Sequence, residues 1–140
     1  MKYIIIPLIS ALMVHLIKLV IDLLKKRFSW QRAFGYGGMP SSHSALVGSL
    51  ATVVYLQEGL SLSFGISVIL ALIVMRDAIG LRGYLSRHGR IINKLIKDLP
   101  NEEEYKYPVM EVTIAHTITQ IITGAVLGIV ITLLIIQNLM

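Results

Sequence analysis

The sequence predicts an all-α integral membrane protein with about four transmembrane helices and one cytoplasmic amphipathic helix. Of its 140 residues, 55% are hydrophobic, and the mean hydropathy is +0.74, which is too apolar for a soluble domain of this size. The apolar residues gather in four stretches, and the basic residues gather in two of the connections between them. We therefore treat residues 1–140 as a single membrane domain.

The four apolar stretches cover residues 3–24, 43–57, 60–81 and 113–138. A helix needs about 20 residues to cross the hydrocarbon core of a bilayer, so the second stretch is short for a span. We expect it to extend back into the preceding loop or to lie in a thinned or re-entrant position. The first stretch superficially resembles a signal peptide, but it lacks a small-residue cleavage site, so we expect it to be retained.

The basic residues predict the topology. Ten of the 13 Lys and Arg residues lie in the connections after the first and third spans. They are Lys25, Lys26, Arg27 and Arg32 in one, and Arg82, Arg87, Arg90, Lys94, Lys97 and Lys106 in the other. The positive-inside rule then places both connections in the cytoplasm and both termini outside, in a plasma membrane of the bacterial type. Since topology accounts for the net charge of +5, we expect no nucleic-acid partner.

Residues 82–99 have the pattern of an amphipathic helix. Apolar positions recur at helical spacing while the basic residues fall largely on other faces, and Pro100 closes the pattern. The repeating positions are Leu81, Leu85, His88, Ile91, Ile92, Leu95, Ile96 and Leu99. Such a helix is typical of one that lies on an anionic cytoplasmic leaflet. The alternative is a helix that packs its apolar face on a neighbouring part of the protein.

The run from Gly37 to Ser44 joins glycines, a proline and serines to His43 at the start of the second stretch. Glycine allows close approach of the backbone to an anion, and a serine-capped helix N-terminus favours phosphate. An ordinary loop followed by a capped helix explains the same pattern.

Further ionisable residues lie within the spans, where charges are costly and therefore candidates for function. His15, Lys18, Asp22 and Lys25 share one face of the first span, and a simple neutralisation of Lys18 by Asp22 is the alternative. Near the end of the third span, the guanidinium groups of Arg76 and Arg82 could bind phosphate oxygens, and the Asp77 carboxylate could orient one of them or a histidine. The alternative is that these residues only flank the span as positive charges that set its orientation, with one ion pair between them.

The fourth stretch begins with His116 and Gln120, four residues apart, followed by Gly124 and Gly128, which form a small-residue helix contact. His116 alone would be an ordinary packing residue. However, the polar groups of all four spans fall toward one side of the membrane. Two histidines, cations and a helix N-terminus fit phosphoryl transfer through a phosphohistidine. This chemistry needs no metal or other cofactor, and no carboxylate cluster suited to Mg²⁺ is visible.

Three strings resemble the divergent membrane branch of the type 2 phosphatidic acid phosphatases, the acid phosphatase/vanadium-dependent haloperoxidase-related proteins. They are Gly37-Gly38-Met39-Pro40-Ser41-Ser42-His43-Ser44-Ala45, Val74-Met75-Arg76-Asp77-Ala78 with Gly80-Leu81-Arg82 and Asn93, and His116-Thr117 with Gln120 and Gly124. The resemblance extends from about Lys18 to Gly128, and its first string is the specific one.

The resemblance implies roles for several of these residues. His116 matches the nucleophile and His43 the general acid, while Lys18 matches the lysine that binds phosphate. Ser41 or Ser42 matches the phosphate-binding hydroxyl. Gly38 belongs to the same motif. We expect Arg76 or Arg82 to supply the arginine, from charge and position alone, and Asp77 and Gln120 to support the site.

The chain also departs from the parent family. Ser42 stands where that family has glycine, Val109-Met110 replaces a Ser-Arg pair ahead of the nucleophile, and Gln120 replaces the carboxylate that orients it. Asp77 or Glu111 is a candidate substitute for that carboxylate. Since the parent family usually has six core helices, four spans imply a reduced core or a homodimer.

Two functions are therefore expected as alternatives. The first is a membrane phosphatase, an enzyme that hydrolyses a lipid phosphate or pyrophosphate at a site facing the cytoplasm. The second is a non-catalytic binder or carrier of phosphorylated lipids. In both cases the partners are the membrane and a phosphorylated lipid.

Overall fold

The computed structural model describes residues 1–26, 38–99, 107–110, 112 and 115–139. Within these ranges the regular structure is entirely helical, which confirms the predicted all-α class. The helices are α1 (Lys2–Leu24), α3 (Ser42–Glu58), α4 (Leu62–Ile79), α5 (Leu81–Lys97) and α7 (Ile118–Leu139).

Three helical segments are long and apolar enough to cross a membrane: Lys2–Leu24, Leu62–Lys97 and Ile118–Asn138. The 17 residues of α3 extend about 26 Å at the helical rise, slightly less than the roughly 30 Å of a hydrocarbon core. The helical part of the fourth stretch begins at Ile118, later than the expected residue 113, because Thr117 caps the helix as described below.

Helix α3 lies at the centre of the fold and contacts α1, α4 and α7. Its contact with α7 is close because Gly124 lies against the backbone of Ser41 and Gly128 against that of Ala45. A β-carbon at either glycine would collide with a carbonyl oxygen of the facing segment. The small-residue contact predicted for Gly124 and Gly128 is thus confirmed; such close backbone packing holds helices together in lipid.

Buried hydroxyl groups also join the helices inside the bundle. The Ser10 hydroxyl of α1 donates a hydrogen bond of 3.3 Å to the carbonyl oxygen of Gly128, and the side chains of Ser49 and Thr132 hydrogen-bond between α3 and α7. Many large apolar side chains instead point outward, as Leu12 does with 58% of its surface exposed. Helices packed in lipid are expected to place small and polar groups inside the bundle and large apolar groups outside it.

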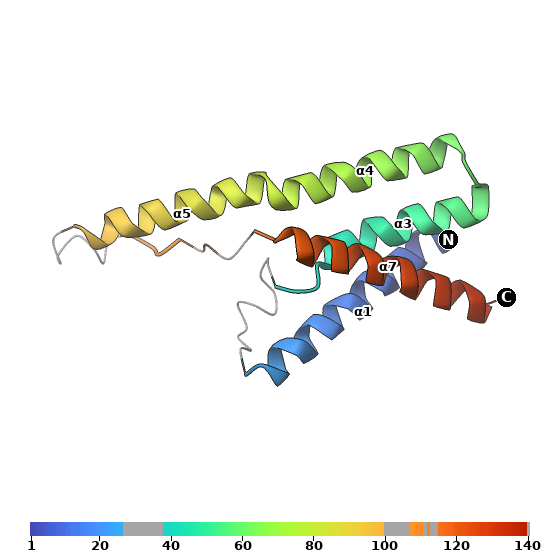
Figure 1. The fold of residues 1–140 in the computed structure, drawn as a ribbon, viewed down its shortest axis with the longest axis horizontal. Coiled ribbons are helices and arrows are strands. Elements are labelled where there is room, and N and C mark those ends of the chain that lie inside the picture. The colour runs from blue at the N-terminus through green and yellow to red at the C-terminus, as the bar shows by residue number, and fades with distance from the viewer. Residues whose placement is uncertain (27–37, 100–106, 111, 113–114, 140) are drawn as a thin grey trace.

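The fold has two distinct ends (Figure 1). Both termini and the turn between α3 and α4 lie toward one end, while the last turns of α1 and α4 and the first turns of α3 and α7 lie toward the other. Beyond this second end, α5 continues nearly in the direction of α4. The predicted amphipathic helix is therefore present, but in this structure it extends α4 rather than turning aside.

Candidate functional site

Segments from both halves of the chain are joined at the end of the bundle opposite the termini. The backbone N–H of Ser41, just before α3, donates to the carbonyl oxygen of Gln120 at 3.2 Å. The backbone N–H of His116, just before α7, donates to the carbonyl oxygen of Ala78 near the end of α4, also at 3.2 Å. These two hydrogen bonds hold the segments that carry His43 and His116 at the same end of the fold.

Ser41 forms the N-cap of α3. Its buried side-chain oxygen accepts hydrogen bonds from the backbone N–H of Ser44 at 3.4 Å and from the Ser44 hydroxyl at 3.0 Å. Ser42, the first residue of the helix, is half-buried, and His43 is exposed. The hydroxyl of Ser41 therefore has a structural role in the cap, which leaves Ser42 as the more accessible of the two predicted phosphate-binding serines.

Lys18 is almost fully buried in α1, with 4% of its surface exposed, and its side chain lies against Gly38. A β-carbon at Gly38 would lie 2.7 Å from Cε of Lys18, and the backbone φ of +86° there also favours glycine. Lys18 makes no ion pair with Asp22 within the described ranges, although the Asp22 charge acts on it from farther away. The Gly38 loop thus packs directly on the predicted phosphate-binding lysine.

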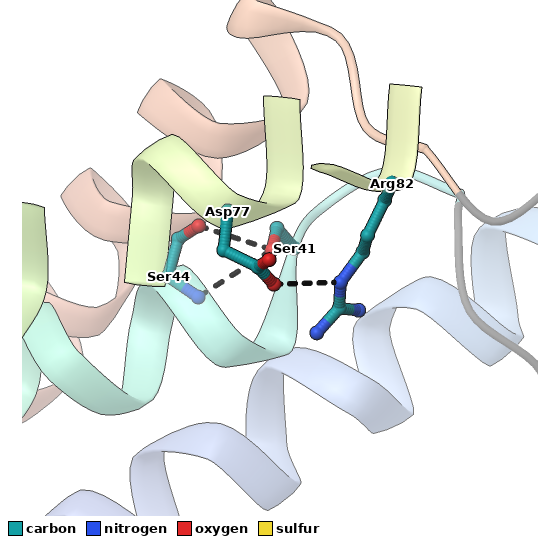
Figure 2. Close-up of polar contacts among 4 residues, drawn as sticks. All are labelled: Ser41, Ser44, Asp77 and Arg82. Carbon is teal, nitrogen blue, oxygen red and sulfur yellow. Dashed lines mark hydrogen bonds and ion pairs between the residues drawn. The ribbon is translucent and has the colours of Figure 1, made fainter. Parts of the chain in front are cut away.

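Asp77 and Arg82 form an ion pair across the junction of α4 and α5. The Nε atom of Arg82 donates to Oδ2 of Asp77 at 3.1 Å, and both side chains are partly exposed. In Figure 2, the Asp77 carboxylate points toward Arg82, whose guanidinium extends in the direction of α1. Arg76 is exposed, and among the ion pairs of the described residues it has none with Asp77. The geometry therefore favours Arg82 over Arg76 as the arginine of the site.

Gln120 orients His116 while it caps α7. The backbone N–H of Thr117 donates to Oε1 of Gln120 at 2.9 Å, and the backbone N–H of Gln120 donates to Oγ1 of Thr117 at 3.3 Å, which is the reciprocal pattern of a capping box. The same Oε1 lies 3.2 Å from Nδ1 of His116. Because the oxygen must face the Thr117 N–H, Nδ1 carries the proton, and the lone pair of Nε2 remains available for chemistry.

The surroundings of His116 favour its neutral form. The residue is 8% exposed, and its burial lowers the pKa of the imidazole below the ordinary value near 6.5. The hydrogen bond with Gln120 acts in the opposite direction, and the charges of Arg82, Lys18 and His43 lower the pKa further. These interactions also show that the two histidines and two of the predicted cations lie within electrostatic reach of one another.

Most of the predicted site is thereby brought to one end of the fold, and some of it is not described. Lys18, Gly38, Ser41, Ser42, His43, Asp77, Arg82, His116 and Gln120 lie at this end. Gly37 and Glu111 lie outside the described residues. No group of three or more His, Cys, Asp or Glu side chains that could hold a metal ion occurs among the residues that the structure describes.

Thr117 and Asn93 support the site, although the resembling strings that contain them gave no role to either. Thr117 pairs with Gln120 in the capping box, and the Thr-x-x-Gln string was available in the sequence as its signal. Asn93 of α5 exchanges two hydrogen bonds with the backbone of Met110, from Nδ2 to the carbonyl oxygen at 2.8 Å and from the backbone N–H to Oδ1 at 2.7 Å. This second contact joins α5 to the segment that leads to His116.

Comparisons with known proteins identify the family of this chain. Residues 1–131 match the family described as the divergent PAP2 family. The chain is 35% identical to a curated protein of Bacillus subtilis (strain 168), the "Uncharacterized membrane protein YuiD", with 91% of each chain covered. No solved structure matches this chain. Since the family match covers residues 1–131 and the relative is 35% identical over 91% of each chain, this membrane protein belongs to the divergent PAP2 family.

Proposed function

We propose that this protein is a membrane phosphatase that hydrolyses a lipid phosphate or pyrophosphate through a histidine nucleophile. The observation that carries the proposal is the state of His116. Its imidazole is buried, its Nδ1 proton is directed to Gln120, and its pKa is lowered. The charges of Lys18 and Arg82 act on it. A neutral imidazole with a lone pair on Nε2 is the form that attacks phosphorus.

The proposed reaction has two steps that balance. In the first, the Nε2 lone pair of His116 attacks phosphorus, the bond from phosphorus to the leaving oxygen breaks, and protonated His43 gives its proton to that oxygen. In the second, neutral His43 takes a proton from water as the water oxygen attacks phosphorus. The bond between phosphorus and Nε2 then breaks, which releases inorganic phosphate and restores both histidines.

Other groups at this end would stabilise the negative charge of the transferring phosphoryl group. Lys18 and Arg82 supply positive charge, and the half-buried Ser42 supplies a hydroxyl beside the N-terminus of α3. Asp77 would act as a positioning residue because its carboxylate holds Nε of Arg82. The exposed Arg76 is outside this set.

We further propose that the site faces the cytoplasm of a bacterial-type plasma membrane. The ten basic residues of the two basic connections support this orientation, because those connections leave and re-enter the bundle at the end that carries His43 and His116. Both termini would then lie outside.

A non-catalytic carrier of phosphorylated lipids is the second candidate. The observation that favours it is Gln120, a neutral amide that already accepts a hydrogen bond from Thr117. An amide cannot stabilise the imidazolium charge that forms when His116 attacks, as a carboxylate would. A carrier would keep the phosphate-binding groups and lose turnover.

The experiment is phosphate release from phosphatidic acid, phosphatidylglycerol phosphate and polyprenyl pyrophosphate by the purified protein. His43→Asn and His116→Asn should each lower the rate at least about 100-fold, and vanadate should inhibit the unmodified protein. His88→Asn, at an exposed histidine of α5, is the matched control and should keep full activity. Activity that survives in both site variants would contradict the mechanism, whereas vanadate-competed lipid binding without phosphate release would favour the carrier.

A further inference from the structure

The amphipathic helix α5 presents its apolar face outward. Leu81, Leu85 and Leu95 are exposed over 65%, 54% and 61% of their surfaces, and Tyr84 and Ile91 beside them are exposed over 60% and 58%. These residues occupy one side of the helix by their spacing of three and four residues. A helix that packs on its own protein would bury this side, so the alternative of an apolar contact with a neighbouring segment does not hold for the described residues.

The opposite side of α5 is polar and is partly covered. Ser86 and Gly89 are buried, and Asn93 holds the backbone of Met110 through two hydrogen bonds. The helix therefore contacts its own chain with small and polar residues and leaves the large apolar residues to another partner. That partner must have an apolar region that can cover this face of α5 next to the end of the bundle.

The charge of α5 indicates what kind of partner this is. Five basic residues and no acidic residue lie between Leu81 and Lys97. They are Arg82, Arg87, Arg90, Lys94 and Lys97. Two such helices from two copies of the chain would bring these like charges together, which opposes self-association. An anionic bilayer surface offers negative headgroups beside an apolar interior and complements both features.

We propose that α5 is a surface anchor that binds anionic phospholipid, with its apolar face in the headgroup boundary and Arg87, Arg90, Lys94 and Lys97 at the headgroups, while Arg82 stays with Asp77. The helix follows α4 directly, and together they form the 36-residue apolar segment Leu62–Lys97. Since about 20 residues cross a bilayer, the 18 residues of α4 nearly suffice for the crossing and α5 would begin at the membrane surface. Gly80 between them has φ −77° and ψ −80°, which departs from helical values, and it is the point about which α5 would turn to the surface. The anchor does not depend on the proposed catalytic activity.

The test uses single cysteines, since the chain contains none. Leu95→Cys on the apolar face and Arg90→Cys on the polar face of the full-length protein would each carry an environment-sensitive probe in nanodiscs. In nanodiscs of phosphatidylcholine with phosphatidylglycerol, the Leu95→Cys probe should be quenched by lipid-borne quenchers and shielded severalfold from a water-soluble quencher. The Arg90→Cys probe should stay accessible to water in every lipid.

The lipid charge and the protein charge serve as controls. Three changes should each make the Leu95→Cys probe accessible to the water-soluble quencher. They are nanodiscs of phosphatidylcholine alone, high salt, and the double substitution Arg87→Gln with Lys94→Gln in the Leu95→Cys protein. Equal water accessibility of the Leu95→Cys probe in both lipids would overturn the proposal. The proposal would also be overturned if the probe were shielded equally in both lipids, but only in nanodiscs that hold two copies of the protein. In that case a second copy of the chain would cover the apolar face of α5.

Discussion

His116 and Gln120 connect structure and chemistry at the scale of single residues. The capping box fixes the amide orientation of Gln120, which in turn fixes the Nδ1 proton of His116. A residue pair needed to start α7 thus also sets the tautomer that the proposed nucleophile requires. The departure from the family carboxylate removes a negative charge but keeps the orientation of the ring.

The lowered pKa of His116 predicts a dependence of stability on pH. Its folded-state pKa lies below the unfolded value near 6.5, so the unfolded chain binds more protons between the two values. The stability linked to neutral His116 is therefore complete above pH 6.5 and is lost as the pH falls through the folded-state pKa. Thermal unfolding in detergent should show this loss, and His116→Gln should reduce it; an unchanged pH dependence in the variant would argue against a buried neutral imidazole.

Substitutions of Gln120 separate its two roles. Gln120→Glu keeps the capping box and places a negative charge beside Nδ1, so it should raise the pKa of His116 and move the acidic limb of kcat/KM to higher pH. Gln120→Leu removes the Gln120 side-chain half of the capping box and the hydrogen bond to His116, while the Thr117 hydroxyl still caps the helix, so it should lower stability by up to about 1 kcal/mol. Thermal unfolding and pH–rate profiles check both. The same acidic limb in Gln120→Glu and the unmodified protein would mean that Gln120 does not contact His116 during turnover.

At the scale of helices, the site exists because α3 and α7 approach closely. Gly124 lies against Ser41, and the N–H of Ser41 in turn hydrogen-bonds the carbonyl oxygen of Gln120. The glycine spacing in the sequence predicted this contact. The apolar stretches of the sequence lie close to the helices α1, α3 and α4, and apolar periodicity to α5, whereas α7 begins at Ile118 rather than at the expected residue 113.

Other features at this scale depend on tertiary contacts and could not be read from the sequence. On the polar face of α5, Asn93 hydrogen-bonds the backbone of Met110, 17 residues further along the chain. The choice of Arg82 over Arg76 follows from the direction of the helix after Gly80 and from the Asp77 contact. Spacing alone left both arginines open.

Gly124→Ala tests the close approach of α7. The added methyl group would collide with the carbonyl oxygen of Ser41, so we expect a loss of about 1–3 kcal/mol in stability together with a loss of activity. Gly65→Ala in α4 is the matched control, because no atom lies within 4 Å of a β-carbon there. It should be neutral or stabilise the helix by up to about 1 kcal/mol. Thermal unfolding of both variants checks this, and equal stability would contradict the described helix contact.

At the scale of the whole molecule, the two ends of the fold differ in character. The end with both termini carries the α3–α4 turn, while the opposite end carries the segments of His43 and His116 and the start of α5. In the sequence, the two basic connections adjoin this second end. The positive-inside rule turns this difference into an orientation.

Impermeant thiol labelling of single-cysteine variants tests that orientation. We expect Gln57→Cys, exposed near the α3–α4 turn, to react in intact cells. Lys97→Cys, exposed at the end of α5, should react only after permeabilisation. The reverse pattern would place the histidine site outside the cell.

The central claim is that His116 attacks phosphorus, and trapping the intermediate tests it most directly. The purified protein would be mixed with lipid substrate labelled in the transferred phosphate, quenched with alkali, and mapped by mass spectrometry. We predict an alkali-stable phosphoryl group on His116 that is absent from His116→Asn and retained in His88→Asn. Hydrolysis of the substrate with no phosphoryl group on His116 at any time, or with the group on another residue, would contradict the account.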